Sequence, residues 1–259
     1  MKLQTWAIAV LAVMAAGCAV SERTASSNFV ETSEIAANAE SPADNDFELL
    51  EEDLDERMIE VADPLEFLNR IMYNVNDALY FCVVKPCTGI FEKVVPKPAR
   101  IGIRNFFHNL TTPARFANCH LQGKPKAADT ELKRFIINTT IGILGFGDPA
   151  LDKHGLEPVK EDLGQTLATY GLGNGFYIVL PVLGPSTLRD SVGLVGDQFL
   201  NPVRYVEPAE TSIAISATKY TNEGSFHIGE YEVFKSAAID PYVAMRNAYI
   251  QYRNKKIKE

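Results

Sequence analysis

The sequence lacks an uninterrupted apolar run of the length that a membrane-spanning helix requires. Its longest stretch without formal charge covers 26 residues, from Leu163 to Leu188, but glycine and proline interrupt it repeatedly. A spanning helix needs about 20 consecutive, predominantly apolar residues, and an internal proline removes a helical hydrogen bond. A second uncharged run, from Phe135 to Gly147, is too short to cross and ends among glycines. We therefore expect neither run to cross a bilayer as one helix.

Histidine, cysteine and catalytic motifs are also scarce. The four histidines are scattered, and neither a G-x-S-x-G elbow nor an H-E-x-x-H pair occurs. Cys82, Cys87 and Cys119-His120 superficially resemble a zinc set but lack its usual spacing, which favours small buried side chains; a disulfide between two of these cysteines stays open. The glycine-rich stretch from Gly171 to Gly175 lacks the spacing of a nucleotide-binding loop. We expect no enzyme, no metal and no cofactor.

The N-terminus predicts export and lipidation. Lys2 is followed by an uncharged apolar run to Ala16, and Gly17-Cys18 completes a box of small residues before a cysteine, as in bacterial lipoproteins. Residues 1–17 then form the signal peptide, and Cys18 carries the acyl chains. By resemblance to bacterial lipoproteins, Ala19 favours delivery to the outer membrane. The alternative is an ordinary cleaved signal that releases a soluble periplasmic protein.

Charge divides the remaining chain into a tail and a body. The net charge of −8 has its source in residues 18–60, where 13 acidic residues and only Arg23 and Arg57 give −11, while the chain from Val61 onward has 20 acidic and 22 basic residues. The tail is poor in aromatic residues and cannot bury enough apolar surface to order itself. We expect a tether over residues 18–60 and a folded body over residues 61–259; the acidic run could instead dock a basic partner.

Helix-start signals recur in the body. Asp63-Pro64, Thr112-Pro113, Asp148-Pro149 and Asp240-Pro241 each place a capping side chain before a proline, which suits the first helical position. Apolar spacing from Asp63 to Cys82 predicts the first helix. Strands are expected to be scarce. Further helices are predicted over these ranges: Pro98–Leu110, Pro113–Leu121, Ala128–Leu144, Lys160–Tyr170, Pro185–Phe199, Glu207–Lys235 and Pro241–Lys255.

Two polar features of the body have open interpretations. Asn69, Tyr73 and Asn76 belong to a polar and aromatic stripe on the first helix, which suits either a solvated face or a surface at lipid-headgroup depth. Arg100 and Arg104 lie one turn apart in the only dense basic cluster, which predicts a face for lipid phosphates, an acidic partner or plain solvation. Nucleic acid is excluded by the near-neutral body and the export signal.

The broken uncharged runs also have two interpretations. Irregular backbone is tolerated at membrane depth only where protein buries it or where it lines a wet cavity. The runs therefore suit interfacial or re-entrant elements around a channel. A glycine-rich turn buried in a soluble core suits the same composition.

Short motifs follow one another along the body in a fixed order. They are Asp63-Pro64-Leu65-Glu66, Asn69-Arg70, Met72-Tyr73-Asn74 and Asn76, then Pro96, Pro98 and Arg100, Asn105-Phe106 and Asn109-Leu110, Gly171 with Leu180-Pro181, Gly184 with Thr187-Leu188-Arg189-Asp190, and Asp240-Pro241-Tyr242 with Arg246. In order and spacing this set resembles the MlaA (VacJ) family of outer-membrane lipoproteins. The family usually has Phe directly before the Asn-Arg pair, where this chain has Leu68.

The resemblance implies an all-α, ring-like body with amphipathic helices embedded in one leaflet around a central channel. It implies a lipid-anchored protein of the Gram-negative outer membrane that faces the periplasm and associates with trimeric porins. Such a protein removes mislocalised phospholipids from the outer leaflet and passes them to a soluble periplasmic carrier of the Mla pathway, without covalent chemistry.

We assign the channel wall, as a hypothesis, to the run from Leu163 to Leu188 and to the first helix. The candidate lipid-channel residues are Asn69, Tyr73, Asn76, Arg100, Gly171, Gly173, Gly175, Tyr177 and Pro181. A porin-associated scaffold or adaptor without lipid conduction is the alternative, and a lipid-degrading enzyme is a third.

Overall fold

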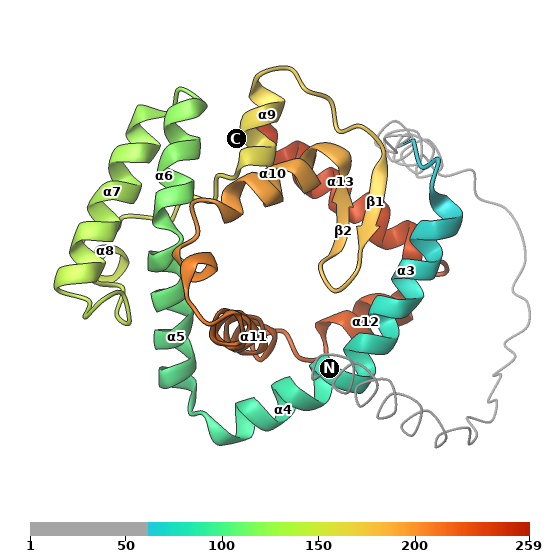
Figure 1. Cartoon of the computed structure of the whole chain (residues 1–259), viewed down its shortest axis with the longest axis horizontal. Coiled ribbons are helices and arrows are strands. Elements are labelled where there is room, and N and C mark those ends of the chain that lie inside the picture. The colour runs from blue at the N-terminus through green and yellow to red at the C-terminus, as the bar shows by residue number, and fades with distance from the viewer. Residues whose placement is uncertain (1–61) are drawn as a thin grey trace, which may run out of the picture. The chain divides into compact units, whose positions relative to one another are not determined.

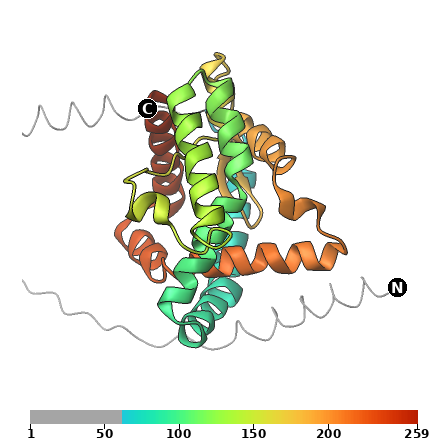
Figure 2. The same cartoon turned by 90° about the vertical axis from the view of Figure 1, so that its left-hand side faces the viewer.

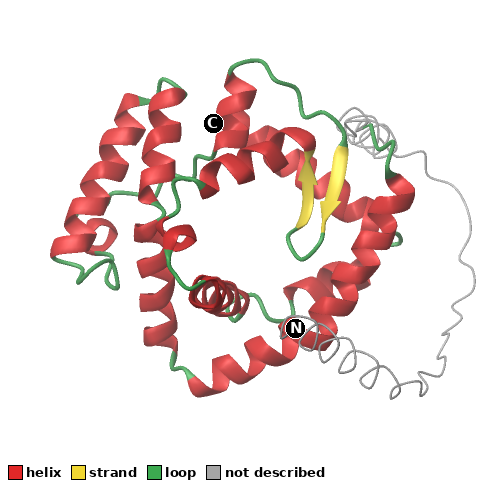
Figure 3. Ribbon diagram, in the orientation of Figure 1, coloured by secondary structure: helices red, strands yellow, loops and turns green. Residues whose placement is uncertain are grey.

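The computed structural model describes residues 62–259, so the predictions for the signal peptide, Cys18 and the acidic tether fall outside the described residues. The described chain is helical except for one two-stranded hairpin and its connecting segments (Figure 3). Its elements in chain order are α3 (Glu66–Leu79), a π-helical segment (Tyr80–Val84), α4 (Lys85–Val94), α5 (Lys97–Leu110), α6 (Thr112–Leu121), α7 (Pro125–Thr140), α8 (Pro149–Asp152), α9 (Leu163–Thr169), β1 (Tyr177–Leu180), β2 (Gly184–Thr187), α10 (Leu188–Gln198), a 3₁₀ turn (Pro202–Tyr205), α11 (Ala209–Gly224), α12 (Glu230–Ala237) and α13 (Pro241–Lys258).

The helices of this unit follow one another around a ring. Figure 1 shows α3 on the right of the ring, α4 at the bottom and α5 on the left, with α10 and the hairpin completing it at the top, and α7 and α8 lying outside α5 and α6. Helix α11 is seen end-on within the ring in Figure 1 and lengthwise in Figure 2, so its axis is roughly perpendicular to the plane of the ring. The predicted all-helical, ring-like body is confirmed.

Polar side chains set several helix starts. The carboxylates of Asp148 and Asp240 accept hydrogen bonds from backbone amides in the first turns of α8 and α13, as the Asp-Pro motifs predict. Asp162, Thr187 and Asn201 cap α9, α10 and the 3₁₀ turn in the same way, without a following proline in the first two cases. Because these caps fix where each element begins, α9 starts at Leu163 rather than at the predicted Lys160.

The capping prediction is wrong for Asp63 and Thr112. The Asp63 carboxylate instead accepts hydrogen bonds from Asn69 Nδ2 at 2.8 Å and from Arg246 Nη1 at 3.1 Å. Thr112 lies inside α6, where its Oγ1 accepts a hydrogen bond from Arg115. Both oxygens bind side chains rather than helix amides, and the Asp63 partners join the start of α3 to α13.

Backbone conformation explains the other differences from the predicted helices. Helix α7 ends at Thr140 rather than Leu144 because Ile143 and Leu144 adopt positive φ angles of 54° and 57°. The predicted helix from Glu207 to Lys235 is two helices, since the chain turns before α12 at Gly229, where φ is 91°.

Three predicted helices match closely, namely those seen as α5, α6 and α13. The predicted helix from Pro185 instead begins at Leu188, because the preceding residues pair as β2. In the antiparallel hairpin Tyr177 pairs with Thr187 and Leu180 with Gly184, which leaves residues 181–183 as the turn.

The apolar core of the described chain is small and lies between α3, β1 and α13. Tyr73, Tyr177 and Tyr242 meet there edge to face, with ring centroids 6.1 Å apart in both contacts with Tyr242. Val179 and Ile250 complete the cluster. This geometry suits aromatic quadrupoles and fixes the hairpin against the two helices.

Candidate functional site

Burial in this unit is inverted relative to an ordinary water-soluble domain. Among residues 62–259, nineteen buried residues are polar or charged and ten are hydrophobic. Asp, Glu, Lys and Arg are almost never fully buried in soluble domains unless they are paired. The buried polar side chains must therefore satisfy one another, and much of the apolar surface must face outward.

Several segments of the described chain carry large apolar side chains that are exposed. Phe67 on α3 is 77% exposed, Ile143 after α7 is 74% exposed, and Val182 in the hairpin turn is 77% exposed. Phe199 and Leu200, after α10, are exposed as well. Apolar surface of this extent is typical of a site of membrane or protein contact. None of the helices among the described residues has the length and hydropathy of a membrane span.

The polar stripe of α3 faces the hairpin. Asn69 Nδ2 donates to the Tyr177 carbonyl at 3.0 Å, and its Oδ1 accepts from the Val179 amide at 2.9 Å. Asn76 holds the end of β1 and the turn in the same way, through the Leu180 carbonyl and the Val182 amide. The stripe therefore anchors the hairpin, and the interpretation of Asn69 as part of a solvated or headgroup-level face is wrong, because its side chain is buried.

A buried ionic network joins α9, α10 and α13. Arg253 Nε and Nη2 donate to the two carboxylate oxygens of Asp190, both at 2.9 Å, and its Nη1 and Nη2 donate to Asp162 at 2.6 and 2.9 Å. Tyr249 donates a further hydrogen bond to Asp190 at 2.9 Å. Burial alone raises the pKa of each aspartate, but the hydrogen bonds and charge of Arg253 outweigh burial and hold both pKa values below the ordinary range.

Two glycines make room for this network. A Cβ added at Gly193 on α10 would lie 2.4 Å from the Gly164 amide nitrogen on α9. A Cβ added at Gly164 would lie 2.6 Å from Asp190 Oδ1 and 2.7 Å from Arg253 Nη2. Close packing of α9 on α10 therefore depends on the absence of side chains at both positions.

The hairpin, the network and α11 enclose a pocket of about 310 Å³. Leu180 and Leu183 line it from the hairpin, Leu194 lines it from α10, and Tyr220 lines it from α11. The charged side chains of the network, with Asp197, form another part of the wall. Burial raises the pKa of Asp197 despite its hydrogen bonds with the Leu163 amide and with Asn118. An amphipathic molecule would find both apolar and charged walls here, and we call this the inner pocket.

Lys219 of α11 lines two further spaces, one bordered by α6 and α10 and the other by α5 and α10. The larger has a volume of about 210 Å³ and the smaller about 30 Å³. The side chain is half-buried, and this burial lowers its pKa. Among the 16 residues of α11 it is the only basic one, which is the sequence signal that could have found it.

The candidate residues from the sequence lie in three different places. Tyr73, Tyr177 and Asn69 belong to the core or anchor the hairpin, and none of them lines a described pocket. Gly171, Gly173 and Gly175 lie on the connection from α9 to β1, where two of them adopt φ values of 87° and 68°; Pro181 is exposed in the hairpin turn, next to Leu180 of the inner pocket. Leu180 and Leu183 of the inner pocket belong to the run from Leu163 to Leu188 that the sequence analysis assigns to the channel wall. Leu194 and Tyr220 were not singled out from sequence, because no motif marks them.

Arg100 does not present its charge on an exposed face. It is 6% exposed, and its Nη1 donates to the carbonyl and Oγ of Ser225 at 3.0 Å, while Nη2 donates to Glu92 at 3.2 Å. Its guanidinium also lies over the Phe226 ring. Arg100 therefore ties α5 to the end of α11, which corrects the expected exposed basic face at this residue.

The cysteines are a further correction. Cys119 is fully buried, as predicted, whereas Cys82 and Cys87 are exposed on the wall formed by the π-helical segment and α4. Within residues 62–259, no cluster of three or more His, Cys, Asp or Glu side chains is arranged to hold a metal ion.

These features define a class of protein: an all-helical ring with polar pockets between its elements and apolar side chains on its surface. A family model described as MlaA lipoprotein matches residues 61–256. The chain belongs to the MlaA lipoprotein family.

Relatives and one solved structure agree with this assignment. The chain is 36% identical over 200 residues to the intermembrane phospholipid transport system lipoprotein MlaA of Escherichia coli K12, covering 73% of this chain and 76% of the relative. It is 30% identical to the protein of the same name from Haemophilus influenzae, covering 76% and 80%. A solved structure described as the structural basis for maintenance of bacterial outer membrane lipid asymmetry matches with a TM-score of 0.67 and 31% identity, covering 76% of this chain and 99% of that chain.

Proposed function

We propose that this chain is an outer-membrane lipoprotein that takes part in phospholipid transport between membranes. Its relatives from E. coli and H. influenzae carry that name, and the family assignment brings the role to this chain. The observation that carries the proposal is the inverted burial, with apolar side chains outside and polar pockets between the elements. A body of this kind suits a leaflet that contacts its apolar surface while its pockets hold polar groups.

The finer role that we propose is removal of mislocalised phospholipids from the outer leaflet and their transfer to a soluble periplasmic carrier. Acyl tails would contact Leu180, Leu183 and Leu194, while the headgroup would lie toward the charged wall of the same pocket. Acyl chains on Cys18 would keep the protein at the membrane, since each buried methylene contributes about 0.8 kcal/mol. Trimeric porins are the proposed partners within the membrane. The proposal includes no covalent step.

Transfer of labelled phospholipid from proteoliposomes to a soluble acceptor protein tests the proposal. Leu183→Trp places bulk in the inner pocket and should slow transfer several-fold. Val182→Trp is the matched control, because Val182 is the adjacent residue of the same turn, is exposed, and does not line that pocket. Equal transfer rates for the two variants would rule out the inner pocket as the route.

The alternative of a porin-associated scaffold is favoured by the exposed apolar side chains, which suit a protein partner as well as lipid. A scaffold would bind porin and give no transfer above that of empty proteoliposomes. Release of fatty acid or lysolipid during the same assay would instead indicate an enzyme.

A further inference from the structure

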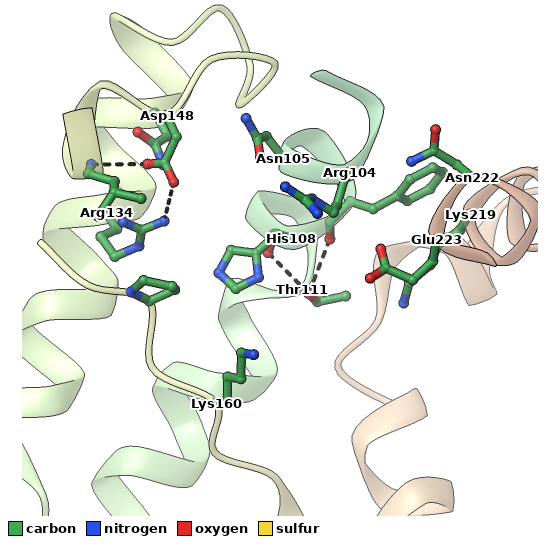
Figure 4. Close-up of a pocket in the computed structure, with 14 residues that line it drawn as sticks. Arg104, Asn105, His108, Thr111, Arg134, Asp148, Lys160, Lys219, Asn222 and Glu223 are labelled. Atoms are coloured by element: carbon green, nitrogen blue, oxygen red, sulfur yellow. Dashed lines mark hydrogen bonds and ion pairs between the residues drawn. The ribbon is translucent and has the colours of Figure 1, made fainter. Parts of the chain in front are cut away.

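A second cavity, larger than the inner pocket, lies where α5, the segment around α8 and the end of α11 come together. Its volume is about 480 Å³, which is within the range of small-molecule sites. Figure 4 shows the lining residues Arg104 and His108 of α5, and Thr111 directly after it, between Arg134 and Asp148 on one side and α11 on the other. We call it the α5 pocket.

Cationic side chains outnumber carboxylates around the α5 pocket. Arg104, Arg134, Lys160 and Lys219 line it, against Asp148 and Glu223. Arg134 and Asp148 neutralise each other through an ion pair of 2.8 Å. Three cations and one carboxylate therefore remain, and the pocket has an excess of positive charge.

The three remaining cations have no carboxylate partner of their own. Within residues 62–259, neither Arg104 nor Lys160 nor Lys219 forms an ion pair, and Arg104 lies over the Phe226 ring at 4.5 Å. Glu223 has its nearest basic partner at 3.6 Å in the exposed His227 rather than in the pocket. Arg104 and Lys160 are exposed and Lys219 is half-buried, whereas other buried or half-buried cations of residues 62–259 are paired, as Arg115, Arg253 and Lys124 illustrate. The charge of Glu223 acts on Lys219, so the cavity keeps an excess of positive charge rather than positive charge alone. A cavity with an excess of charge of one sign is expected to bind a ligand of opposite charge.

His108 adds an unmatched polar atom to the same cavity. Its Nε2 is buried and has no hydrogen-bond partner among the described residues. Burial and the nearby charges of Arg115 and Arg134 lower the pKa of His108 to about 3, so the ring is neutral at physiological pH and offers one N–H donor. Buried polar atoms are rarely left without a partner, and a ligand oxygen would supply one here.

We infer that the α5 pocket is a phosphate-binding site, in which Arg104, Lys160 and Lys219 surround the phosphate oxygens and His108 donates to one of them. Arginine and lysine are the side chains that most often bind phosphate. The phosphate can belong to a lipid headgroup or to a free anion. The first source rests on the proposed function and would make this pocket a headgroup site separate from the inner pocket. Lys219 lines the α5 pocket and also the two smaller spaces beside α10.

Binding of three probes to the purified full chain in detergent tests the inference by phosphorus NMR titration. The probes are inorganic phosphate, glycerophosphoethanolamine and dihexanoyl phosphatidylethanolamine. A headgroup site binds the third probe at least tenfold more tightly than the first. A site for free phosphate binds inorganic phosphate at least as tightly as the lipid.

Variants locate the binding. Lys160→Gln removes an exposed cation of the pocket wall, and Arg104→Gln removes the cation that α5 contributes. Each substitution should weaken phosphate binding about tenfold, the range expected for a hydrogen bond to a charged group. Lys126→Gln is the control, because Lys126 is exposed on α7 and does not line the pocket. Its affinity should stay within about twofold of the unchanged protein.

The inference is overturned if none of the probes binds saturably, or if all three variants weaken binding equally, which would indicate general charge attraction. The transfer assay keeps the two proposals separate. Active transfer without phosphate binding would remove this inference and leave the proposed function standing. Phosphate binding without any lipid transfer would remove the proposed function and leave the phosphate-binding site standing.

Discussion

The ionic network around Arg253 should contribute more to stability than any exposed ion pair of this unit. The substitution Arg253→Met keeps most of the side-chain length and removes the charge that α13 contributes to Asp162 and Asp190. Asp162 would then lose its cationic partner, Asp190 would keep only its ion pair of 3.0 Å with Arg189, and α13 would lose its ionic contact with α9 and α10. We expect the folded unit to be destabilised with its helices otherwise unchanged.

The magnitude follows from burial. Removing one partner of a buried ion pair costs about 3–5 kcal/mol, because the other charge stays buried without compensation. The side chains of Arg253 and Asp190 are 9% and 6% exposed, whereas that of Asp162 is 39% exposed and partly solvated. Since Asp162 is partly solvated and the buried Asp190 keeps Arg189 as a partner, we expect the low end, about 3 kcal/mol.

Arg70 offers a matched control within the same chain. It also binds two carboxylates, Glu66 and Asp240, each at 2.8 Å, but its side chain is 40% exposed. Exposed pairs contribute about 0–1 kcal/mol, so Arg70→Met should cost about 1 kcal/mol, including its contact with the Tyr242 ring. Urea unfolding of both variants in detergent, followed by far-ultraviolet circular dichroism at pH 7, measures the difference.

The pH dependence gives a second readout. The folded pKa values of Asp162 and Asp190 lie below those of unfolded aspartate, so their stabilising contribution is fully present above about pH 4 and is lost as the pH falls through the folded values. The difference between the unchanged protein and Arg253→Met should therefore shrink as the pH is lowered from 7 to 3. Equal costs for the two arginine variants, or a cost that does not change with pH, would refute this account.

Three further predictions follow from other contacts. Gly193→Ala should destabilise the unit by about 1–3 kcal/mol, because its Cβ would overlap the α9 backbone, whereas Gly89→Ala, with nothing within 4 Å of the added Cβ, should be neutral or slightly stabilising. The midpoints of urea unfolding compare the two variants, and equal midpoints would contradict the predicted overlap. Asn69→Leu should speed amide exchange at Val179 about tenfold by removing its buried acceptor, and Asn105→Leu, whose bond to Phe146 is 3.5 Å long, should leave that exchange unchanged. In the Cys18→Ser protein, Ile143→Asp should weaken the affinity for phospholipid vesicles, measured by flotation, about tenfold or more, while His154→Asp, which also places an aspartate at an exposed position, should not. Equal flotation of the two variants would argue against lipid contact at the turn after α7.

Local sequence signals predicted the helices well where the decisive contacts are themselves local. Asp148 and Asp240 cap the helices that follow them, and Gly123 and Gly155 end helices with φ values of 68° and 62°. Each of these contacts joins residues within a few positions of one another. A cap or a left-handed glycine can therefore be predicted without knowledge of the fold.

The same signals failed where a distant residue competes for the side chain. Asp63 precedes a proline just as Asp148 does, yet it binds Arg246, which lies 183 residues away in the sequence. Arg100 belongs to a basic cluster on a helix, yet it binds Ser225, 125 residues away. Helical spacing states which residues share a face and leaves open which partner that face meets.

The pockets depend on distant partners in the same way. The inner pocket needs a hairpin turn, α10 and a tyrosine of α11 to meet, and the α5 pocket needs three segments that are separate in the sequence. A lysine such as Lys219 signals a site only as the single basic residue of its helix. The functional role of this lysine depends on the cavity that the other helices form around it.

The amphipathic pattern of α3 explains why its polar stripe was interpreted as a solvated or headgroup-level face. The sequence defines two stripes on this helix, and ordinary soluble packing would bury the apolar one. Here Leu68 and Val75 are exposed at 53% and 42%, while Asn69 is buried at 2%. The difference arises because the hairpin backbone needs the hydrogen bonds of Asn69, and unmet backbone groups cost more than exposed leucines in an apolar surrounding. An apolar surrounding is therefore the condition under which this arrangement of α3 is favourable, and vesicle binding of Ile143→Asp examines that condition at a second, independent surface.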